Sequence, residues 1–343
     1  MGNLQEMEAT IKTMAVAGKG ILAADESTST IEKRLKSINV ACTEENRRAY
    51  RELLFTAPGL GDYISGVIMY DETIRQSTKA GKPFSKALAQ QKIVPGIKVD
   101  KGLVPLPGSE EENITQGLDG LADRLKEYKL LGARFAKWRA LLVISEQYPS
   151  MFAIRSNAQA LARYAAICQQ QGIIPIVEPE LLMDGDHSIA RCAFATERTL
   201  ATVFQELRHH RVLLELMILK PSMVIAGKDC PEQAKPEQVA KETVKILRRT
   251  VPAAVPTINF LSGGQSDEAA TEHLNFINKL GLQPWVLSFS YGRALQASAL
   301  KAWGGDPNKI SIAQQALLKR AKLNNAASLG KYELEMEHAL AVC

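Results

Sequence analysis

The chain has 343 residues, of which 46% are hydrophobic and 23% are charged, and this composition predicts a folded globular protein with a large core. The net charge is +5, but there is no arginine-rich run and no basic stripe with interleaved aromatic residues, so a nucleic-acid partner is not expected. The excess of cations better suits a small anionic substrate.

Eight short apolar runs recur along the chain, and most of the intervals between them carry amphipathic helical patterns. Eightfold strand–helix alternation predicts an α/β fold, a single-domain (β/α)8 TIM barrel over residues 1–343, with a short C-terminal tail from about residue 330. A doubly wound open sheet is the rival, but its dinucleotide-binding G-x-G-x-x-G turn is missing, as is a Walker A loop. The runs are 20–24, 63–69, 93–99, 133–138, 173–177, 213–219, 256–261 and 285–290.

Helices are expected between these runs, and the segment after the seventh run shows why. Ser266 is a natural N-cap, Asp267 and Glu268 lie in the first turn where the helix dipole favours carboxylates, and Gly281 ends the helix. The other helical patterns cover 31–55 (two helices), 118–131, 158–171, 197–209 and 311–323.

Almost every apolar run ends in an ionisable or hydroxyl side chain. In a TIM barrel all eight carboxyl ends of the strands meet at one face, where barrel enzymes carry their chemistry. Seven charged ends that converge there are hard to explain as ordinary surface. The residues are Asp25, Asp71, Lys98, Lys137, Glu178, Lys220, Ser262 and Arg293.

Lys220 ends the most apolar run and is followed at once by Pro221, which favours extended geometry at the lysine. Partial burial at the mouth of a core strand favours the neutral amine, which can attack a carbonyl and form a Schiff base. Taken alone, a lysine that extends to solvent is the commoner case. The other strand ends change that balance.

Two pairs with a spacing of two residues accompany Lys220. Lys137 and Arg139 should share one face of a strand, and so should Glu178 and Glu180. Burial and mutual repulsion would favour the protonated form of one carboxyl, which suits general acid/base work. A rim of salt bridges is the alternative for these residues.

Two anion sites are expected. The first combines Ser262, Gly263 and Gly264 with Gly292 and Arg293, because glycines and helix N-termini after the last two barrel strands often hold phosphate. A pair of tight turns is the alternative. The second follows Asp25, and a capped helix start would look the same. Its residues are Ser27, Thr30, Lys33 and Arg34.

The five histidines show no metal-ligand spacing with a second histidine or cysteine, so neither a metal nor a cofactor is expected. The five cysteines are scattered, which predicts reduced thiols in a cytoplasmic protein. The N-terminus has no secretory pattern, and no apolar run approaches the ~18–20 residues of a membrane span, so no membrane partner is expected.

These motifs resemble those of class I fructose-1,6-bisphosphate aldolases, from near residue 11 to near residue 335. The matching stretches are GKGILAADES (18–27), PGIKVDKGLVPLPG (95–108), TQGLDGLADR (115–124), GARFAKWR (132–139), ARYAAICQQ (162–170), PIVEPELLMDGDH (175–187), LKPSMV (219–224), FLSGGQS (260–266) and SFSYGRALQASAL (288–300).

The resemblance implies a lyase of glycolysis and gluconeogenesis, a cytoplasmic, metal-independent homotetramer that cleaves fructose 1,6-bisphosphate into dihydroxyacetone phosphate and glyceraldehyde 3-phosphate. Lys220 would form the Schiff base and Glu178 would act as its general acid/base. Lys137 would repel the positive charge of Lys220, and Asp25 would take the proton of the C4 hydroxyl. By the same resemblance Glu180 would support this network, Lys98 and Arg139 would add cationic contacts, Ser262, Gly263, Gly292 and Arg293 would bind one phosphate, and Ser27, Thr30, Lys33 and Arg34 would lie near the other.

The sequence departs from the family at three places. Many animal-type members end in a tyrosine that assists proton exchange at the enamine, whereas this chain ends in Cys343 and its last tyrosine is Tyr332. The proton donor to the enamine therefore stays open. Ser29 stands where glycine is usual, and Ser222 replaces the usual asparagine two residues after Lys220.

Two other functions stay open. One is a Schiff-base barrel aldolase or transaldolase that acts on a different sugar phosphate. The other is a binding or scaffold protein that keeps the fold without catalysis, although no expected catalytic residue is missing. The sequence also leaves the preference between fructose 1,6-bisphosphate and fructose 1-phosphate open.

Overall fold

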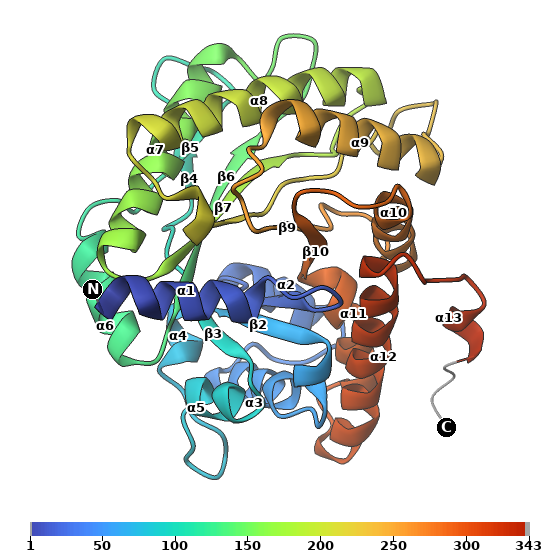
Figure 1. Ribbon diagram of the computed structural model, residues 1–343. Coiled ribbons are helices and arrows are strands. Elements are labelled where there is room, and N and C mark those ends of the chain that lie inside the picture. The colour runs from blue at the N-terminus through green and yellow to red at the C-terminus, as the bar shows by residue number, and fades with distance from the viewer. Residues whose placement is uncertain (1, 340–343) are drawn as a thin grey trace.

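The computed structural model of the protein describes residues 2–339, and its central feature is a closed barrel of parallel strands surrounded by helices (Figure 1). The order around the barrel is β1-β10-β9-β8-β7-β6-β3-β2. The predicted TIM barrel is confirmed. Its strands are β1 (Gly20–Ala24), β2 (Ile64–Met69), β3 (Val94–Lys98), β6 (Phe135–Leu142), β7 (Ile174–Leu181), β8 (Ile218–Leu219), β9 (Thr257–Phe260) and β10 (Val286–Tyr291).

The expected helices are present. No helix in residues 2–339 combines the length and the apolar character that a bilayer crossing demands. The helices are α1 (Gly2–Met14), α2 (Thr28–Lys36), α3 (Glu44–Phe55), α4 (Asp71–Ile74), α5 (Phe84–Gln90), α6 (Leu121–Leu130), α7 (Met151–Gln170), α8 (Ile189–His209), α9 (Pro236–Thr250), α10 (Asp267–Lys279), α11 (Arg293–Trp303), α12 (Ile310–Ser328) and α13 (Met336–Ala339), with short 3-10 turns at Leu60–Asp62, Leu214–Leu216 and Pro307–Lys309.

Two strands are longer than their apolar runs. β6 continues to Leu142 and β7 to Leu181, because each carries its charged residues inside the strand rather than just after it. The two strands pair in parallel along their whole length, and Arg139 lies opposite Glu178 in this register. A long paired ladder holds these side chains at fixed positions.

The run 213–219 is a strand only at its end, so the predicted boundary there is wrong. Residues Leu214–Leu216 form a 3-10 turn, and β8 is reduced to Ile218–Leu219. The side chain of Gln169 explains the difference. Its amide donates to the carbonyls of Leu213 and Leu216, at 2.8 and 3.1 Å, and accepts from the Leu213 N–H at 2.9 Å. These backbone groups therefore need no neighbouring strand.

Helix α1, which the sequence patterns did not predict, lies across the barrel (Figure 1). It buries Met7, Ile11 and Met14 in an inner cluster with Ile21 and Phe135 from the barrel strands. Their spacing of four and three residues is that of one helix face. The amino end of the barrel is therefore closed by apolar packing, and the carboxyl end is left for the site.

A small antiparallel hairpin, β4 (Leu103–Pro105) and β5 (Asn113–Thr115), follows β3 and was also not predicted. The barrel itself closes between β1 and β10, where Ile21 pairs with Ser290. The hydroxyl of Ser288 donates to the carbonyl of Lys19 at 2.7 Å and strengthens this seam.

Candidate active site

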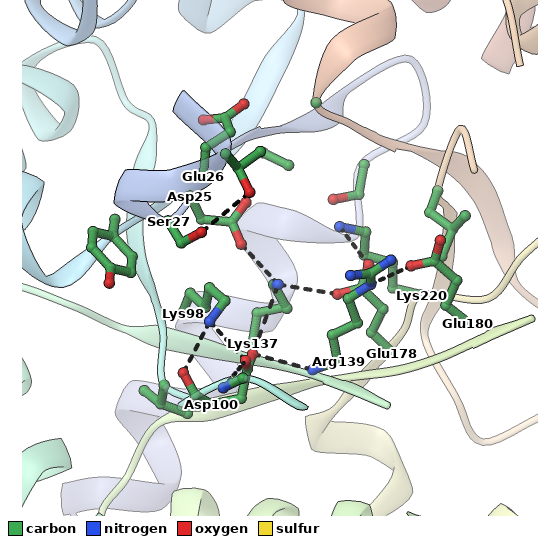
Figure 2. Close-up of a pocket in the computed structure, with 18 of the residues that line it drawn as sticks. Asp25, Glu26, Ser27, Lys98, Asp100, Lys137, Arg139, Glu178, Glu180 and Lys220 are labelled. Carbon is green, nitrogen blue, oxygen red and sulfur yellow. Dashed lines mark hydrogen bonds and ion pairs between the residues drawn. The ribbon is translucent and has the colours of Figure 1, made fainter. Parts of the chain in front are cut away.

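A cavity of about 1220 Å³ opens at the carboxyl ends of the barrel strands. All eight strand-end residues singled out in the sequence line it, and Figure 2 shows the charged residues at its centre. The topology explains this convergence, because parallel strands of a closed barrel end at one face. The eight residues are Asp25, Asp71, Lys98, Lys137, Glu178, Lys220, Ser262 and Arg293.

Lys137 lies at the centre of this group and is buried, with 3% of its surface exposed. Its Nζ is 2.8 Å from Asp25 Oδ2, 3.3 Å from Glu178 Oε2 and 4.0 Å from Asp100 Oδ2. Burial alone would lower the pKa of Lys137, but the three carboxylates outweigh burial and raise it. Lys137 is therefore a permanent cation in this pocket.

Asp25 is the opposite case. Burial alone would raise the pKa of this carboxyl, but Lys137, Lys220 and Lys98 outweigh burial and hold the pKa well below its ordinary value. Asp25 is therefore ionised at neutral pH and is available to accept a hydrogen bond or a proton.

Lys220 is also buried, at 4% exposure, and its Nζ is 3.0 Å from Glu178 Oε1. Glu178 thus lies between two ammonium groups, as Figure 2 shows. This carboxylate counteracts the repulsion between Lys137 and Lys220 that the resemblance implied. A proton passed from Lys220 to Glu178 would free the amine as a nucleophile.

Glu180 and Arg139 form a separate pair, with Nε 2.5 Å from Oε2. The two glutamates of β7 both line the cavity, but each has its own cation instead of facing the other. The structure therefore contains the salt bridges that were the alternative for these two glutamates. It also places Glu178 next to Lys220.

Asp100 was not singled out in the sequence, although it follows Lys98 at the same two-residue spacing as the other pairs. Its Oδ1 is 2.7 Å from Lys98 Nζ, which also donates to the Asp100 carbonyl at 2.9 Å, and its Oδ2 accepts from the backbone N–H of Arg139 at 3.4 Å. The two-residue spacing from Lys98 was the sequence signal that could have identified Asp100. The central cluster now contains four cations (Lys98, Lys137, Arg139 and Lys220) and four carboxylates (Asp25, Asp100, Glu178 and Glu180).

The first expected anion site lies at the rim of the cavity. Ser262, Gly263 and Gly264 line it, and the two glycines have positive φ angles of 54° and 93°. A Cβ on Gly264 would lie 3.0 Å from the sulfur of Met183 and 3.6 Å from Nη2 of Arg293, so the loop and Arg293 face each other closely. Within residues 2–339 Arg293 has no ion pair, and Gly292 beside it also lines the cavity.

Gln265 holds this loop from behind and was also missed. It is 7% exposed, its side-chain amide donates to the Ser262 carbonyl at 3.0 Å, and its Oε1 is 2.6 Å from Nδ1 of His273 on α10. A buried amide with both ends engaged fixes the loop in one geometry. No local sequence pattern announces such a contact.

The second expected anion site is also on the cavity wall. The Ser27 hydroxyl is 3.1 Å from that of Thr30 and makes no capping bond to α2, which argues against a simple capped helix start. Lys33 and Arg34 both line the cavity, and Arg34 is also paired with Glu26, a residue that the sequence patterns did not single out. Glu26 also binds the buried Arg51 at 2.6 Å.

Among residues 2–339, no group of three or more histidine, cysteine, aspartate or glutamate side chains is placed to hold a metal ion.

The family model for fructose-bisphosphate aldolase class-I, described as glycolytic, matches residues 6–342. The chain belongs to this family. It is 57% identical over 332 residues to a probable fructose-bisphosphate aldolase class 1 of Xanthomonas campestris pv. campestris, covering 96% of this chain and 99% of that one. It is 56% identical to the cytosolic fructose-bisphosphate aldolase 4 of Arabidopsis thaliana, covering 96% and 84% of the two chains.

A solved structure of the Plasmodium falciparum fructose-bisphosphate aldolase, in complex with TRAP and a small-molecule inhibitor, matches this aldolase family member with a TM-score of 0.95. The two sequences are 52% identical, and the match covers 97% of this chain and 96% of that one. The agreement extends over the whole barrel. Class I aldolases are metal-independent lyases with a Schiff-base mechanism, and the buried Lys220 fits that chemistry.

Proposed function

We propose that this aldolase reversibly cleaves fructose 1,6-bisphosphate into dihydroxyacetone phosphate and glyceraldehyde 3-phosphate, with Lys220 as the Schiff-base residue. One observation carries the proposal. A buried lysine lies 3.0 Å from Glu178, and Glu178 lies 3.3 Å from Lys137, which is 2.8 Å from Asp25. These groups form one continuous chain of ion pairs, in which Lys137 connects the two carboxylates.

The first half of the reaction forms the imine. The neutral amine of Lys220 attacks C2 of the ketose, and Glu178, which has taken a proton from Lys220 beforehand, gives that proton to the developing alkoxide. Glu178 then takes a proton from the carbinolamine nitrogen and passes it to the hydroxyl, which leaves as water. The product is a protonated imine. Lys137, held as a cation, lies 3.3 Å from Glu178 and helps to position it.

The second half breaks the C3–C4 bond. Asp25, held ionised by the surrounding lysines, takes the proton of the C4 hydroxyl, and the aldehyde forms as the electron pair of the bond moves into the imine. An enamine remains on Lys220. Protonation of C3 and hydrolysis then release dihydroxyacetone phosphate and return the free amine.

The rim residues hold the two phosphates. Ser262, Gly263, Gly292 and Arg293 bind one of them, and the second lies near the hydroxyls of Ser27 and Thr30 with Lys33 and Arg34. Lys98 and Arg139 add positive charge between these sites, and Glu180 keeps Arg139 in place. Only a bisphosphate would use both ends of the cavity. Comparing turnover of the bisphosphate with that of a monophosphorylated ketose separates this function from the other sugar-phosphate aldolases.

Borohydride reduction in the presence of dihydroxyacetone phosphate tests the proposal directly. The label is expected on Lys220, with no labelling in Lys220→Met and full labelling in Lys245→Met, which removes an exposed lysine of α9. EDTA should leave the activity unchanged. A label on another residue, or activity that EDTA abolishes, would contradict the mechanism.

We further propose that residues 1–343 work as one catalytic domain in a cytoplasmic homotetramer. The cytosolic name of the Arabidopsis relative supports the location. Membership of the class I aldolase family supports the tetramer, because the resemblance implies that oligomeric state. Analytical ultracentrifugation measures the oligomeric state, and a monomer at micromolar concentration would contradict the homotetramer.

A further inference from the structure

The strand that carries Lys220 has few backbone ties. β8 is two residues long, and its ladder with β7 ends where the Lys220 N–H donates to the carbonyl of Val177 at 2.8 Å. The next residue is Pro221, which has no N–H to donate, so the ladder cannot continue. β7 nevertheless continues to Leu181 and carries both glutamates beyond this point.

Ser222 ties the two segments together where the backbone cannot. Its Oγ accepts from the Leu181 N–H at 3.0 Å and donates to the Leu181 carbonyl at 3.0 Å. A serine hydroxyl is able to do both, because it carries one proton and two lone pairs. Both residues are buried, at 7% and 4% exposure, so water does not compete for these bonds.

The hydrogen bonds of Lys220 and Ser222 to β7 lie on either side of Glu178 along that strand. Val177 is tied to Lys220 on one side of Glu178, and Leu181 is tied to Ser222 on the other. The distance of 3.0 Å between Glu178 and the Lys220 ammonium therefore depends on both. If the second tie were lost, β7 and the chain after Lys220 could move apart.

We propose that Ser222 is a positioning residue for the Lys220–Glu178 pair, which its hydroxyl holds in register by fastening the end of β7 to the segment after Lys220. This inference rests on the proposed Schiff-base function. Proton transfer between Glu178 and the carbinolamine needs a short, fixed distance, and small displacements of reacting groups lower rates strongly. The expected defect is therefore in imine formation rather than in phosphate binding.

The test compares three variants by the rate of borohydride trapping with dihydroxyacetone phosphate, by kcat and KM for cleavage, and by thermal midpoint. Ser222→Ala removes both bonds. Ser222→Asn keeps a donor and an acceptor in the side chain. Ser65→Ala is the matched control, because the buried Ser65 hydroxyl also binds backbone carbonyls, of Gly20 at 3.1 Å and Met14 at 3.3 Å, at the opposite end of the barrel.

Ser222→Ala is expected to lower the trapping rate and kcat by about tenfold with little change in KM, as displacement of a reacting group predicts. Ser222→Asn should recover most of the loss, and Ser65→Ala should keep kcat even where its thermal midpoint falls. Trapping of Ser222→Ala at the wild-type rate would overturn the inference, and so would an equal loss in a folded Ser222→Asn. Failure to label Lys220 in the wild-type enzyme would overturn the proposed function itself.

Discussion

Glu178 contacts the ammonium groups of Lys137 and Lys220. Replacing it with glutamine tests the effect of its charge without changing the size of the side chain. Glu178→Gln keeps the size of the side chain but can neither accept a proton from Lys220 nor balance Lys137. Because a positioned general acid/base contributes ~10²–10⁴-fold, kcat should fall within that range. Single-turnover borohydride trapping measures the affected step. An intact trapping rate with slow cleavage would place the role of Glu178 later in the reaction.

Replacing Asp100 tests two explanations of its role, because they predict opposite changes in KM. Asp100→Asn makes the cluster more positive, and if charge alone mattered, phosphate would bind more tightly and KM would fall. The carboxylate, however, fixes Lys98 at 2.7 Å. We expect KM to rise about five- to tenfold, since removing one partner of a buried, hydrogen-bonded charge pair costs binding energy. Steady-state kinetics decide between these outcomes.

The matched control for Asp100 is Asp123→Asn, which removes the same charge from an exposed position, where 83% of the side chain is accessible. It should leave KM unchanged at physiological salt, because exposed charges are screened. A lower KM in Asp100→Asn would show that Lys98 needs no anchor.

At the scale of elements, helix α10 connects pH to stability through His273. Burial lowers the pKa of His273 to about 4, from an ordinary value of 6.5. Between these values the unfolded chain binds more protons than the folded one, so stability should fall as the pH drops from 6.5 to 4. His273→Asn should remove this part of the pH dependence, on the order of 2 kcal/mol after allowance for partial exposure.

Urea unfolding at pH 7 and pH 4.5 measures that difference. His209→Asn is the control, because 58% of the His209 side chain is exposed. An unchanged pH dependence in His273→Asn would mean that His273 titrates alike in the folded and unfolded chains. Since His273 also contacts Gln265, which holds the Ser262 loop, KM measured in the same variant reports whether this contact reaches the phosphate site.

The elements also show how far sequence reasoning extends. Strands were predictable because most barrel strands contain a short, mostly apolar run, and their ends pointed to the cavity because topology makes them converge. Ser222, Glu26 and Gln265 were not predictable as contacts, because each acts through a partner on another element. The departure at Ser222 was visible in the sequence, but its bonds to Leu181 depend on how the chain runs after Pro221.

The boundary errors have similar causes. The 3-10 turn before β8 depends on Gln169, more than forty residues earlier in the chain. Helix α1 was missed although Met7, Ile11 and Met14 have helical spacing, because no acidic residue in its first turn marks its start. The chain departs from the family at its C-terminus, where a tyrosine is missing. That departure falls in residues 340–343, which lie outside the described part of the chain. The expected tail begins near residue 330, and Tyr332 within it is buried at 3% exposure.

At the scale of the whole molecule, the amino end of the barrel is closed by apolar packing, whereas the carboxyl end carries the site. Substitutions at the amino end test whether stability and catalysis are separate. Met14→Ala removes a side chain that is 1% exposed from the closed amino end. The cavity left behind should cost about 2–4 kcal/mol of unfolding free energy. At a temperature where the variant is folded, kcat should not change, since the site lies at the opposite end.

Chemical denaturation and steady-state kinetics on the same sample check both parts of this prediction. Leu4→Ala on the same helix is the control, because Leu4 is 43% exposed and its loss should cost little. A drop in kcat for folded Met14→Ala would show that the two ends of the barrel are coupled.

The seam between β1 and β10 has a consequence for how the protein is made. Asp25 follows the first strand and Arg293 follows the last, so the active site spans the seam. During translation β1 can pair with β2 early, but its other edge waits until β10 leaves the ribosome. A nascent chain shorter than about 291 residues therefore has an unpaired strand edge and an incomplete site, a state that exposes it to aggregation and to chaperones. The chain becomes catalytically competent only when the first and last strands of the barrel, β1 and β10, have paired.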